Sequence, residues 1–256
     1  MKLSKDFKEI KGDASFRKFF RKKKNGSSSV VVFAKKEKFK NLIVYEAINK
    51  ILIKHNILAP KLYSENYSKN YIEIQDFGDE TIYEKLIKKN KNLLAYYKKI
   101  IRLLKQIQSI KVKKIKTFKN KNYSIPLYDQ KVLINEANLF CDWYVKKNLP
   151  KSNKKKFSKE FKKIVKKLAS QLILRNNVFV HRDFHISNLM LVNNRIGVID
   201  SQDALIGNKA YDLASLIDDV RFKIPNTLKK KIFNFYLRKQ KIKEIHKFKN
   251  DFEILS

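Results

Sequence analysis

The residues best suited to carry chemistry lie in the segment HRDFHISN, residues 181–188, directly after the apolar run VFV. Its aspartate, Asp183, stands five positions before Asn188. In phosphoryl transfer to an alcohol, the aspartate of such a loop accepts the proton of the attacking hydroxyl, and the asparagine holds a magnesium ion beside the phosphates. The spacing therefore predicts Asp183 as the catalytic base and Asn188 as a metal ligand.

A second carboxylate, Asp200, ends the apolar run IGVI, 17 positions after Asp183. At the end of a strand, it could hold magnesium ions that bridge the β- and γ-phosphates and neutralise charge in the transition state. Residues 181–220 carry six acidic side chains against three basic ones, whereas the whole chain has 59 Lys and Arg against 24 Asp and Glu. Since hard cations prefer carboxylate oxygens, we expect Asp200 to be the main metal ligand.

Three polar residues near the predicted base are candidates for contact with the acceptor. His185 lies inside the loop, and Gln202 and Asp203 follow the predicted metal ligand within three positions. They are chosen for their proximity in sequence, and a structural role in the loop is the alternative for each.

The charge of the chain bears on its partners. The formal net charge is +35, which by itself suggests a nucleic acid or an anionic membrane. The lysines, however, are spread over nearly every polar helix face, which is typical of solvated faces. We therefore expect no nucleic acid and no membrane as partner.

Cysteine usage and apolar patterning suggest a cytoplasmic monomer. The single cysteine, Cys141, excludes an intramolecular disulfide and is expected to pack in the interior. No apolar run approaches the roughly 18 residues that a spanning helix requires, and the charged N-terminus lacks the apolar region of a secretory signal.

The pattern of apolar residues predicts a small sheet with one helix, followed by a mainly helical region. Two strand-like runs around the turn NGSSS predict a β-hairpin near the N-terminus. Helical spacing over residues 37–56 predicts a helix that Pro60 ends, and two strands are expected before Gly78. We place a lobe boundary there, with residues 1–78 as the N-terminal lobe and residues 79–256 as the C-terminal lobe.

Beyond that boundary, long amphipathic helices are expected over residues 81–89, 92–110, 129–148 and 154–175, interrupted only at 111–128. Short strands are expected in VFV, LMLV and IGVID, and two further helices near residues 210–220 and 226–240. The strands flank the predicted chemical residues and would hold them in place.

Several stretches together resemble a known family. HRDFHISNLM, GVIDSQDA and YDLASLIDD resemble the aminoglycoside phosphotransferase superfamily, whose fold is a two-lobed relative of the protein kinases. GDASFRKFFR, IEIQDFGD and PLYDQKVLINEANLFCDWYV are similar to anomeric kinases of cell-wall recycling, which phosphorylate C1 of N-acetylmuramate and N-acetylglucosamine. The resemblance implies an α+β, protein-kinase-like fold with an antiparallel N-terminal sheet, ATP and Mg²⁺ as cofactors, and a small sugar as substrate.

The resemblance also implies which residues bind the nucleotide. GDASFR would be the turn over the ATP phosphates, with Ser15 and Arg17 beside them, although an ordinary solvated hairpin is the alternative. Residues Gln75, Asp76 and Phe77 would link the lobes, where backbone groups meet the adenine.

Three residues around the predicted base have supporting roles by the same resemblance. His181 and Arg182 would brace the loop, and Asp212 would hydrogen-bond to its backbone. We expect all three to act on the structure of the loop rather than on the substrate.

Two features depart from the relatives. Protein kinases hold the α- and β-phosphates with a strand lysine, for which SVVVFAKK offers Lys35 and Lys36, but lysine is too common here to single one out. Ser201 stands where relatives tend to have Phe, which affects the packing of the metal loop.

The end of the chain also departs from the relatives, which continue beyond the position of Ser256 with several tens of residues of C-terminal helix. A protein ending there, in what resembles the start of a helix, would lack part of the acceptor-pocket wall. We expect reduced stability or altered substrate choice in that case.

Three functions remain open. The first is transfer of the γ-phosphate of ATP to a sugar hydroxyl, the anomeric C1 hydroxyl of N-acetylmuramate or N-acetylglucosamine. The second is phosphorylation of another small alcohol, such as choline, homoserine or an aminoglycoside. The third is nucleic-acid binding on an inactive kinase scaffold, against which the intact base and metal residues argue.

Overall fold

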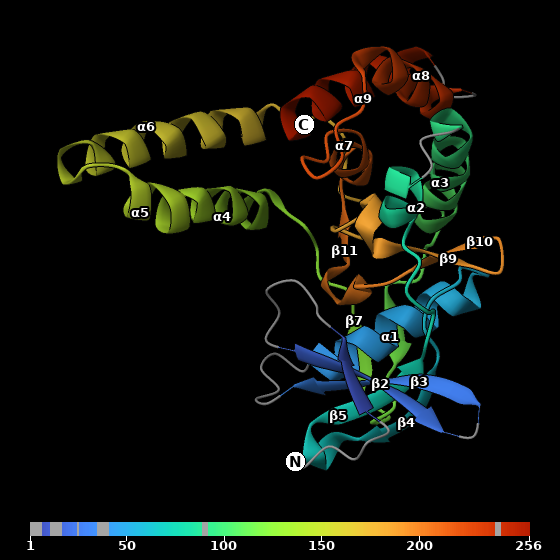
Figure 1. Ribbon diagram of the computed structural model, residues 1–256. Helices are drawn as coiled ribbons and strands as arrows, with labels where there is room; N and C mark the ends of the chain where they lie inside the picture. The colour runs from blue at the N-terminus through green and yellow to red at the C-terminus, as the bar shows by residue number, and fades with distance from the viewer. Residues whose placement is uncertain (1–6, 11–16, 25, 35–40, 89–91, 239–241) are drawn as a thin grey trace.

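The computed structural model describes residues 7–10, 17–24, 26–34, 41–88, 92–238 and 242–256. They form two lobes, one above the other in Figure 1. The small lobe is a five-stranded sheet with one helix, and the large lobe is mainly helical with short paired strands. The predicted α+β, two-lobed architecture is confirmed.

The sheet of the small lobe is antiparallel, with the order β1-β2-β3-β5-β4. Its strands are β1 Phe7–Ile10, β2 Arg17–Lys24, β3 Ser27–Ala34, β4 Leu62–Asn66 and β5 Tyr71–Gln75. β2 and β3 form the predicted hairpin, and Gly26 between them has a φ of 75°, which glycine adopts without strain. The sequence gives no signal for β1, because four residues are too few to show an alternating pattern.

The α-helix of the small lobe, α1 (Asn41–Lys54), contributes to two apolar cores. Leu42 and Tyr45 pack in a cluster with the sheet, whereas Ala47, Ile48, Ile51 and Leu52 belong to the main core of the large lobe. The helix ends well before Pro60, because Asn56 adopts a left-handed conformation with a φ of 59°. The N–H of Ile57 then donates to the carbonyl of Leu52 at 3.0 Å, which satisfies the helix end. The prediction that Pro60 ends this helix was wrong.

The large lobe packs its helices around one core (Figure 1). The helices are α2 Ile82–Lys88, α3 Leu93–Gln108, α7 Tyr211–Ile217, α8 Asn226–Leu237 and α9 Ile242–Leu255. The three predicted strands are present in antiparallel pairs: β9 Leu189–Val192 pairs with β10 Arg195–Val198, and β8 Val178–Val180 pairs with β11 Leu205–Gly207, which was not predicted. Where only the start of a helix was expected near Ser256, α9 forms a helix of 14 residues.

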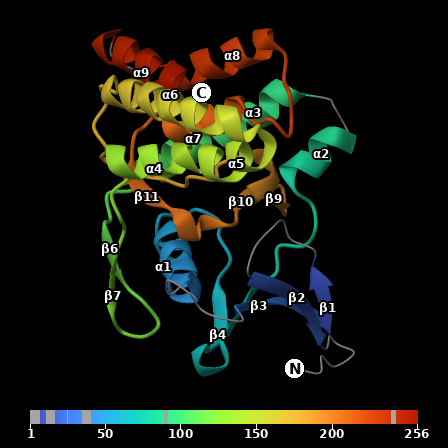
Figure 2. The same ribbon diagram turned by 90° about the vertical axis from the view of Figure 1, so that its left-hand side faces the viewer.

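A two-stranded hairpin, β6 (Lys114–Lys116) with β7 (Asn122–Ser124), extends from the large lobe beside α1 in Figure 2. At its tip, the Phe118 ring meets the Tyr67 ring edge-on at 6.0 Å, and Lys119 Nζ lies 3.5 Å from Glu65 Oε1. Lys50 Nζ on α1 donates to the carbonyl of Lys116 at 3.0 Å. The hairpin therefore ties the large lobe to the small one.

A helical arm projects from the large lobe (Figure 1). It comprises α4 Gln130–Phe140, a π-helical turn Cys141–Val145, α5 Lys146–Asn148 and α6 Lys151–Ser170. Phe140 stacks on Tyr144 and leans on Phe161, with ring centroids 5.2 Å apart in each pair, and Cys141 is buried as expected. Among the described residues, no helix has the length and apolar character needed to span a membrane.

Candidate active site

The loop that follows β8 is fixed by one buried carboxylate. Asp212, on α7, is fully buried and accepts the backbone N–H groups of His181 at 2.8 Å and Arg182 at 2.9 Å. Arg182 has a φ of 78°, a conformation that costs a non-glycine residue about 1–3 kcal/mol unless its surroundings enforce it. Burial raises the pKa of Asp212 to about 7, although the two backbone donors act in the opposite direction. Asp212 thus holds the strained start of the loop in place, as expected.

His181 is buried beneath the same loop. Its ring meets Phe184 edge-on, with centroids 6.0 Å apart. Burial lowers the pKa of His181 to about 4, so the imidazole is neutral near pH 7. A buried neutral ring at this position braces the loop and leaves contact with a substrate to other side chains.

Asp183, the predicted base, is half-buried at the junction of several charged groups. Burial raises the pKa of its carboxyl, and the negative charges of Asp200 and Asp203 raise it further, against the opposing influence of Arg182 and Arg221. These influences require the three carboxylates to lie near one another. A raised pKa suits a group that must accept a proton during a reaction.

Asn188, the predicted metal ligand in the loop, is oriented by its own amide group. Its Nδ2 donates to the carbonyl of Asp183 at 3.1 Å and lies 3.2 Å from Nε2 of His185. Its backbone carbonyl accepts the N–H of Ile199 at 3.1 Å, which joins this loop to the one that carries Asp200. Because the NH₂ group is engaged, the carbonyl oxygen Oδ1 is the atom available to a cation.

Asp200, the second predicted ligand, adopts a left-handed conformation with a φ of 61° at the end of β10. Its Oδ1 accepts a hydrogen bond at 2.8 Å from the guanidinium of Arg17, which lies on β2 of the small lobe. Arg17 also donates to Gln202 Oε1 at 2.7 Å, and Gln202 Nε2 donates to Asp203 Oδ2 at 2.8 Å. The Arg17 side chain is only 7% exposed, so it forms a buried cationic bridge between the lobes.

A second polar link holds the metal loop from the other side. Ser201 is fully buried and donates to Asn49 Oδ1 of α1 at 2.6 Å, and Asn49 Nδ2 donates to the carbonyl of Pro60 at 3.2 Å. Ser201, which stands where the sequence resemblance implies a phenylalanine, therefore has a polar partner. Asn49 was not predicted, although a polar residue on the apolar face of α1 is a signal that it has a buried partner.

The three acceptor-side candidates differ in their surroundings. His185 and Gln202 are buried and hydrogen-bonded inside the loops, whereas the Asp203 side chain is 45% exposed. Arg182 lies 3.8 Å from Asp203 and also pairs with Glu136 on α4 of the arm. Glu136 was missed, because a single acid on an amphipathic helix gives no signal of a partner 46 residues away.

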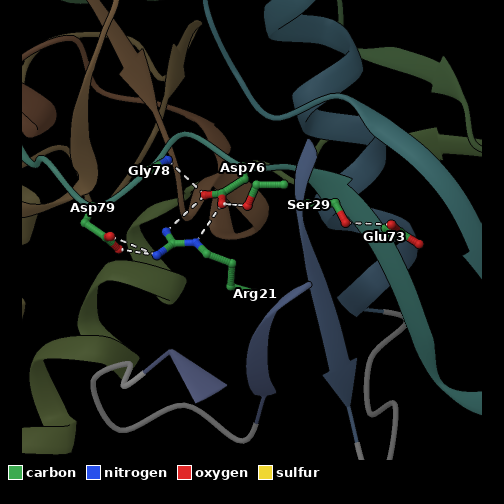
Figure 3. Close-up of polar contacts among 7 residues, drawn as sticks. Arg21, Ser29, Glu73, Asp76, Gly78 and Asp79 are labelled. Atoms are coloured by element: carbon green, nitrogen blue, oxygen red, sulfur yellow. Dashed lines mark hydrogen bonds and ion pairs between the residues drawn. The ribbon is translucent and has the colours of Figure 1, made fainter. Parts of the chain in front are cut away.

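The linker between the lobes, residues 75–79, is held by side chains of the small lobe (Figure 3). Arg21 donates through Nε to Asp76 Oδ2 at 2.6 Å and through Nη1 to Asp79 Oδ1 at 2.7 Å. The N–H of Gly78 donates to Asp76 Oδ1 at 2.9 Å. Asp76 thus fixes the turn with its side chain, which leaves the linker backbone as the part able to meet a ligand.

Phe77, in the same linker, is buried against β10. A Cβ added at Gly197 would lie 2.8 Å from the Phe77 ring, so glycine is needed for this approach. Gln75 lies at the end of β5, and its Oε1 is a buried acceptor without a hydrogen-bond partner among the described residues. Two other predicted nucleotide contacts, Ser15 and Lys35, lie outside the described residues, as does Lys36.

The donor set fits magnesium better than a transition metal. Asp200 offers a carboxylate and Asn188 an amide oxygen, and Mg²⁺ is commonly held by one or two protein oxygens together with substrate phosphates. In the described part of the chain, no cluster of three His, Cys, Asp or Glu side chains could hold a metal alone. The free acceptor of Gln75 is compatible with a nucleotide at the linker.

Comparison with known proteins places this geometry in context. The family model described as "Phosphotransferase enzyme family" matches residues 6–246. An N-acetylmuramate/N-acetylglucosamine kinase of Neisseria meningitidis is 28% identical over 81% of this chain and 59% of that protein. The enzyme of the same name from Pseudomonas aeruginosa is 28% identical over 89% of this chain and 64% of that protein. The chain therefore spans only about three fifths of the length of these curated relatives.

Solved structures match over almost the whole chain. An ADP-bound aminoglycoside phosphotransferase gives a TM-score of 0.65 with 19% identity, covering 98% of this chain and 82% of that one. A Plasmodium vivax ethanolamine kinase gives 0.66 with 16% identity, covering 100% and 74%. At these identities the likeness shows the fold alone, which is the two-lobed, protein-kinase-like fold.

Proposed function

The chain belongs to the phosphotransferase enzyme family, and on this premise we propose that it transfers the γ-phosphate of ATP to a hydroxyl group of a small amino sugar. The observation that carries the proposal is the convergence of Asp183, Asn188 and Asp200 at the junction of the lobes. Few structural roles need a half-buried carboxylate with a raised pKa beside a second, metal-competent carboxylate. Transfer of a phosphoryl group needs both.

The residues would divide the work as follows. Asp183 orients the acceptor hydroxyl and takes its proton, and Asn188 and Asp200 hold magnesium. When bound, the metal neutralises the charge that grows on the transferring phosphoryl group. Asp212 and His181 keep the loop in the one conformation that aims Asp183 at the acceptor.

We assign nucleotide binding to the small lobe and the linker. The backbone of residues 75–77 would meet the adenine, and Ser15, Arg17 and Lys35 are the candidates for the phosphates. Arg17 already reaches the metal loop, where its guanidinium neutralises Asp200. With residues 1–78 covering the nucleotide, residues 79–256 would supply the base and the metal ligands.

The proposed acceptor is N-acetylmuramate or N-acetylglucosamine, phosphorylated at the anomeric C1 hydroxyl. The names of the two curated relatives support this class. Asp203 is the acceptor-side candidate with an exposed carboxylate, which could accept hydrogen bonds from sugar hydroxyls. The net charge of +35 favours anionic ATP and a carboxylate-bearing sugar over a polycationic drug.

The test is acceptor-dependent consumption of Mg-ATP by the purified protein, with phosphorus NMR to identify a sugar 1-phosphate. N-Acetylmuramate and N-acetylglucosamine are compared with choline, homoserine and an aminoglycoside. Turnover of the sugars, lost in Asp183→Asn, is expected. Turnover of another alcohol alone would replace the proposed acceptor, and RNA or DNA binding that survives Asp183→Asn without turnover of any acceptor would replace the proposed activity.

A further inference from the structure

A cavity of about 750 Å³ lies in the large lobe, and none of its lining residues belongs to the candidate active site. It is bordered by the end of α3, the segment before β8, the residue Lys209 before α7, and parts of α8 and α9. Among its described lining residues, one is acidic, Glu244, and six are basic: Lys105, Lys111, Arg175, Lys209, Arg238 and Lys247. Basic side chains are thus concentrated around one hollow rather than spread over a helix face.

The positive charges of this cavity are incompletely compensated by the protein. In the described part of the chain, no carboxylate forms an ion pair with Lys111, Arg175 or Lys247. Burial lowers the pKa of Lys209, the charge of Glu244 acts in the opposite direction, and the charge of Lys111 lowers it further. A half-buried lysine beside a second lysine is stabilised when an anion joins them.

The wall that carries these cations is fixed by buried hydrogen bonds. Asp251 on α9 is fully buried and accepts the N–H groups of Ile173 and Leu174, both at 2.8 Å. It also accepts from Asn208 Nδ2 at 2.6 Å. These contacts hold together the segments that carry Arg175, Lys209 and Lys247, so the cations project from a built frame.

A second set of buried bonds fixes the side formed by α3. Gln108 Nε2 donates to the carbonyl of Lys209 at 2.9 Å, and the hydroxyl of Tyr236 donates to Gln108 Oε1 at 2.5 Å. Lys105 Nζ lies 5.3 Å from the centre of the Tyr236 ring. The cavity is therefore preorganised, which lowers the entropic cost of binding a ligand.

We propose that this cavity is a binding site for a small phosphate-bearing polyanion, distinct from the nucleotide site. A volume of 750 Å³ lies within the range of about 300–1,000 Å³ that is typical of small-molecule sites. Several basic side chains around one hollow match a ligand with two or three phosphate groups better than one with a single carboxylate, because each added charge can meet its own cation. Lysine and arginine side chains are the usual partners of phosphate oxygens.

The position of the cavity connects it to the catalytic loop. Val178, at the start of β8, lines the cavity, and His181 follows directly after the end of this strand. Lys209 lines it three residues before Asp212, which holds the N–H groups of His181 and Arg182. An anion bound here would therefore stabilise both segments that fix the start of the loop.

The experiment measures binding of tripolyphosphate by calorimetry, without nucleotide or divalent cation. The double variant Lys111→Met and Arg175→Met removes two exposed cavity cations and is compared with Lys155→Met and Lys159→Met on α6, which makes the same change in net charge. A loss of at least tenfold in affinity is expected for the cavity variant, with a change of less than twofold in the control.

Equal weakening in both double variants would show diffuse attraction to a basic protein and overturn the proposal. So would loss of binding in Arg17→Leu with retention in the cavity variant, because tripolyphosphate would then occupy the active site. Circular dichroism of each variant establishes that it is folded. Since binding is measured without nucleotide, divalent cation or acceptor, this result is independent of the proposed catalytic function.

Discussion

The catalytic loop and the linker between the lobes are both held by aspartates, yet in opposite electrostatic surroundings. Asp212 is fully buried and binds two backbone N–H groups. Asp76 is paired with the guanidinium of Arg21, and its side chain is only 6% exposed, whereas the neighbouring Asp79, the second partner of Arg21, is 79% exposed (Figure 3). Burial would raise the pKa of Asp76, but the hydrogen bonds from Arg21 and Ser28 outweigh it and the pKa is lowered.

The difference suggests a division between precision and adaptability. Backbone N–H groups bound to a buried carboxylate cannot exchange this partner for water without a large cost, so the loop has one conformation. The ion pair of Arg21 with the exposed Asp79 is weaker and is screened by salt, so this part of the linker can change its geometry at a modest cost. The large lobe thus fixes the chemistry, and the linker accommodates what binds beside it.

The largest effect is expected from Asp183→Asn, which removes the proposed base and leaves the frame around Asp212 intact. We expect kcat to fall by about 10²–10⁴-fold. Thermal stability should be unchanged or slightly higher, because one of three neighbouring carboxylates is neutralised. The measurements are steady-state kinetics with Mg-ATP and thermal unfolding. A loss of activity together with a large loss of stability would mean that Asp183 supports the fold of the loop. Catalysis and the support of the loop would then not belong to different residues.

The next effect is expected from Asp212→Ala, which leaves the N–H groups of His181 and Arg182 without their acceptor. At about 1–3 kcal/mol for each buried donor, the free energy of unfolding should fall by roughly 2–6 kcal/mol. Urea denaturation measures this, with Asp218→Ala, a half-buried aspartate that follows the same helix, as the comparison variant. A smaller loss in free energy of unfolding for Asp212→Ala than for Asp218→Ala would show that Asp212 does not hold the catalytic loop.

The pH dependence of stability separates the two aspartates by sign. The pKa of Asp212 is about 7 in the folded protein, above its unfolded value of about 3.9, so its contribution makes stability fall as pH rises from about 4 to about 7. Asp76 has a lowered folded pKa, so its contribution is present above about pH 4 and is lost as pH falls through the folded pKa. Asp212→Asn should abolish the first slope and Asp76→Asn the second, measured by urea denaturation from about pH 7 down to below pH 4.

A smaller effect is expected from Arg21→Met at the linker. Among the described residues, Asp76, whose side chain is 6% exposed, would keep Ser28 and Gly78 as donors, and the free energy of unfolding should fall by about 1.5–3 kcal/mol. The double variant Arg21→Met with Asp76→Asn, which also neutralises the unpaired carboxylate, should recover part of the lost free energy of unfolding. If the loss in free energy of unfolding caused by Arg21→Met were the same at low and high salt, the comparison with the catalytic loop would be contradicted.

The smallest effect is expected from Asp79→Asn. Its carboxylate is 79% exposed, and exposed ion pairs contribute about 0–1 kcal/mol, so the free energy of unfolding should change by less than about 0.5 kcal/mol. Denaturation at low and high salt provides the measurement. A change as large as that of Arg21→Met would show that Arg21 acts mainly through Asp79.

Local patterns in the sequence predicted much of the fold and the centre of the site. The hairpin of β2 and β3, the helix α3 and the short strands around Asp183 and Asp200 all follow from apolar periodicity within a few neighbouring residues. The motif residues come together because only 17 positions separate Asp183 from Asp200, with a tight pair of strands between them. The residue that ends α1 was misassigned, because the left-handed Asn56 terminates the helix before Pro60 is reached.

The side-chain partners of the site could not be predicted in the same way. Arg17 meets Asp200 across 183 positions, and Asn49 meets Ser201 across 152. Such pairs depend on how the lobes pack, and the sequence around each residue does not distinguish it from an ordinary cation or amide. The interruption at residues 111–128 likewise gave no hint that it would form a hairpin reaching the small lobe.

The packing of α1 against both lobes has a consequence for motion between them. Four of its apolar side chains are embedded in the large lobe, whereas two lie against the sheet, and Asn49 anchors it to the loop of Asp200. If the lobes rotate when a nucleotide enters, the surface that slips should be the one between the sheet and α1, because fewer interlocked side chains must part there. The moving piece would then be the five strands alone, with α1 remaining behind as part of the stationary body.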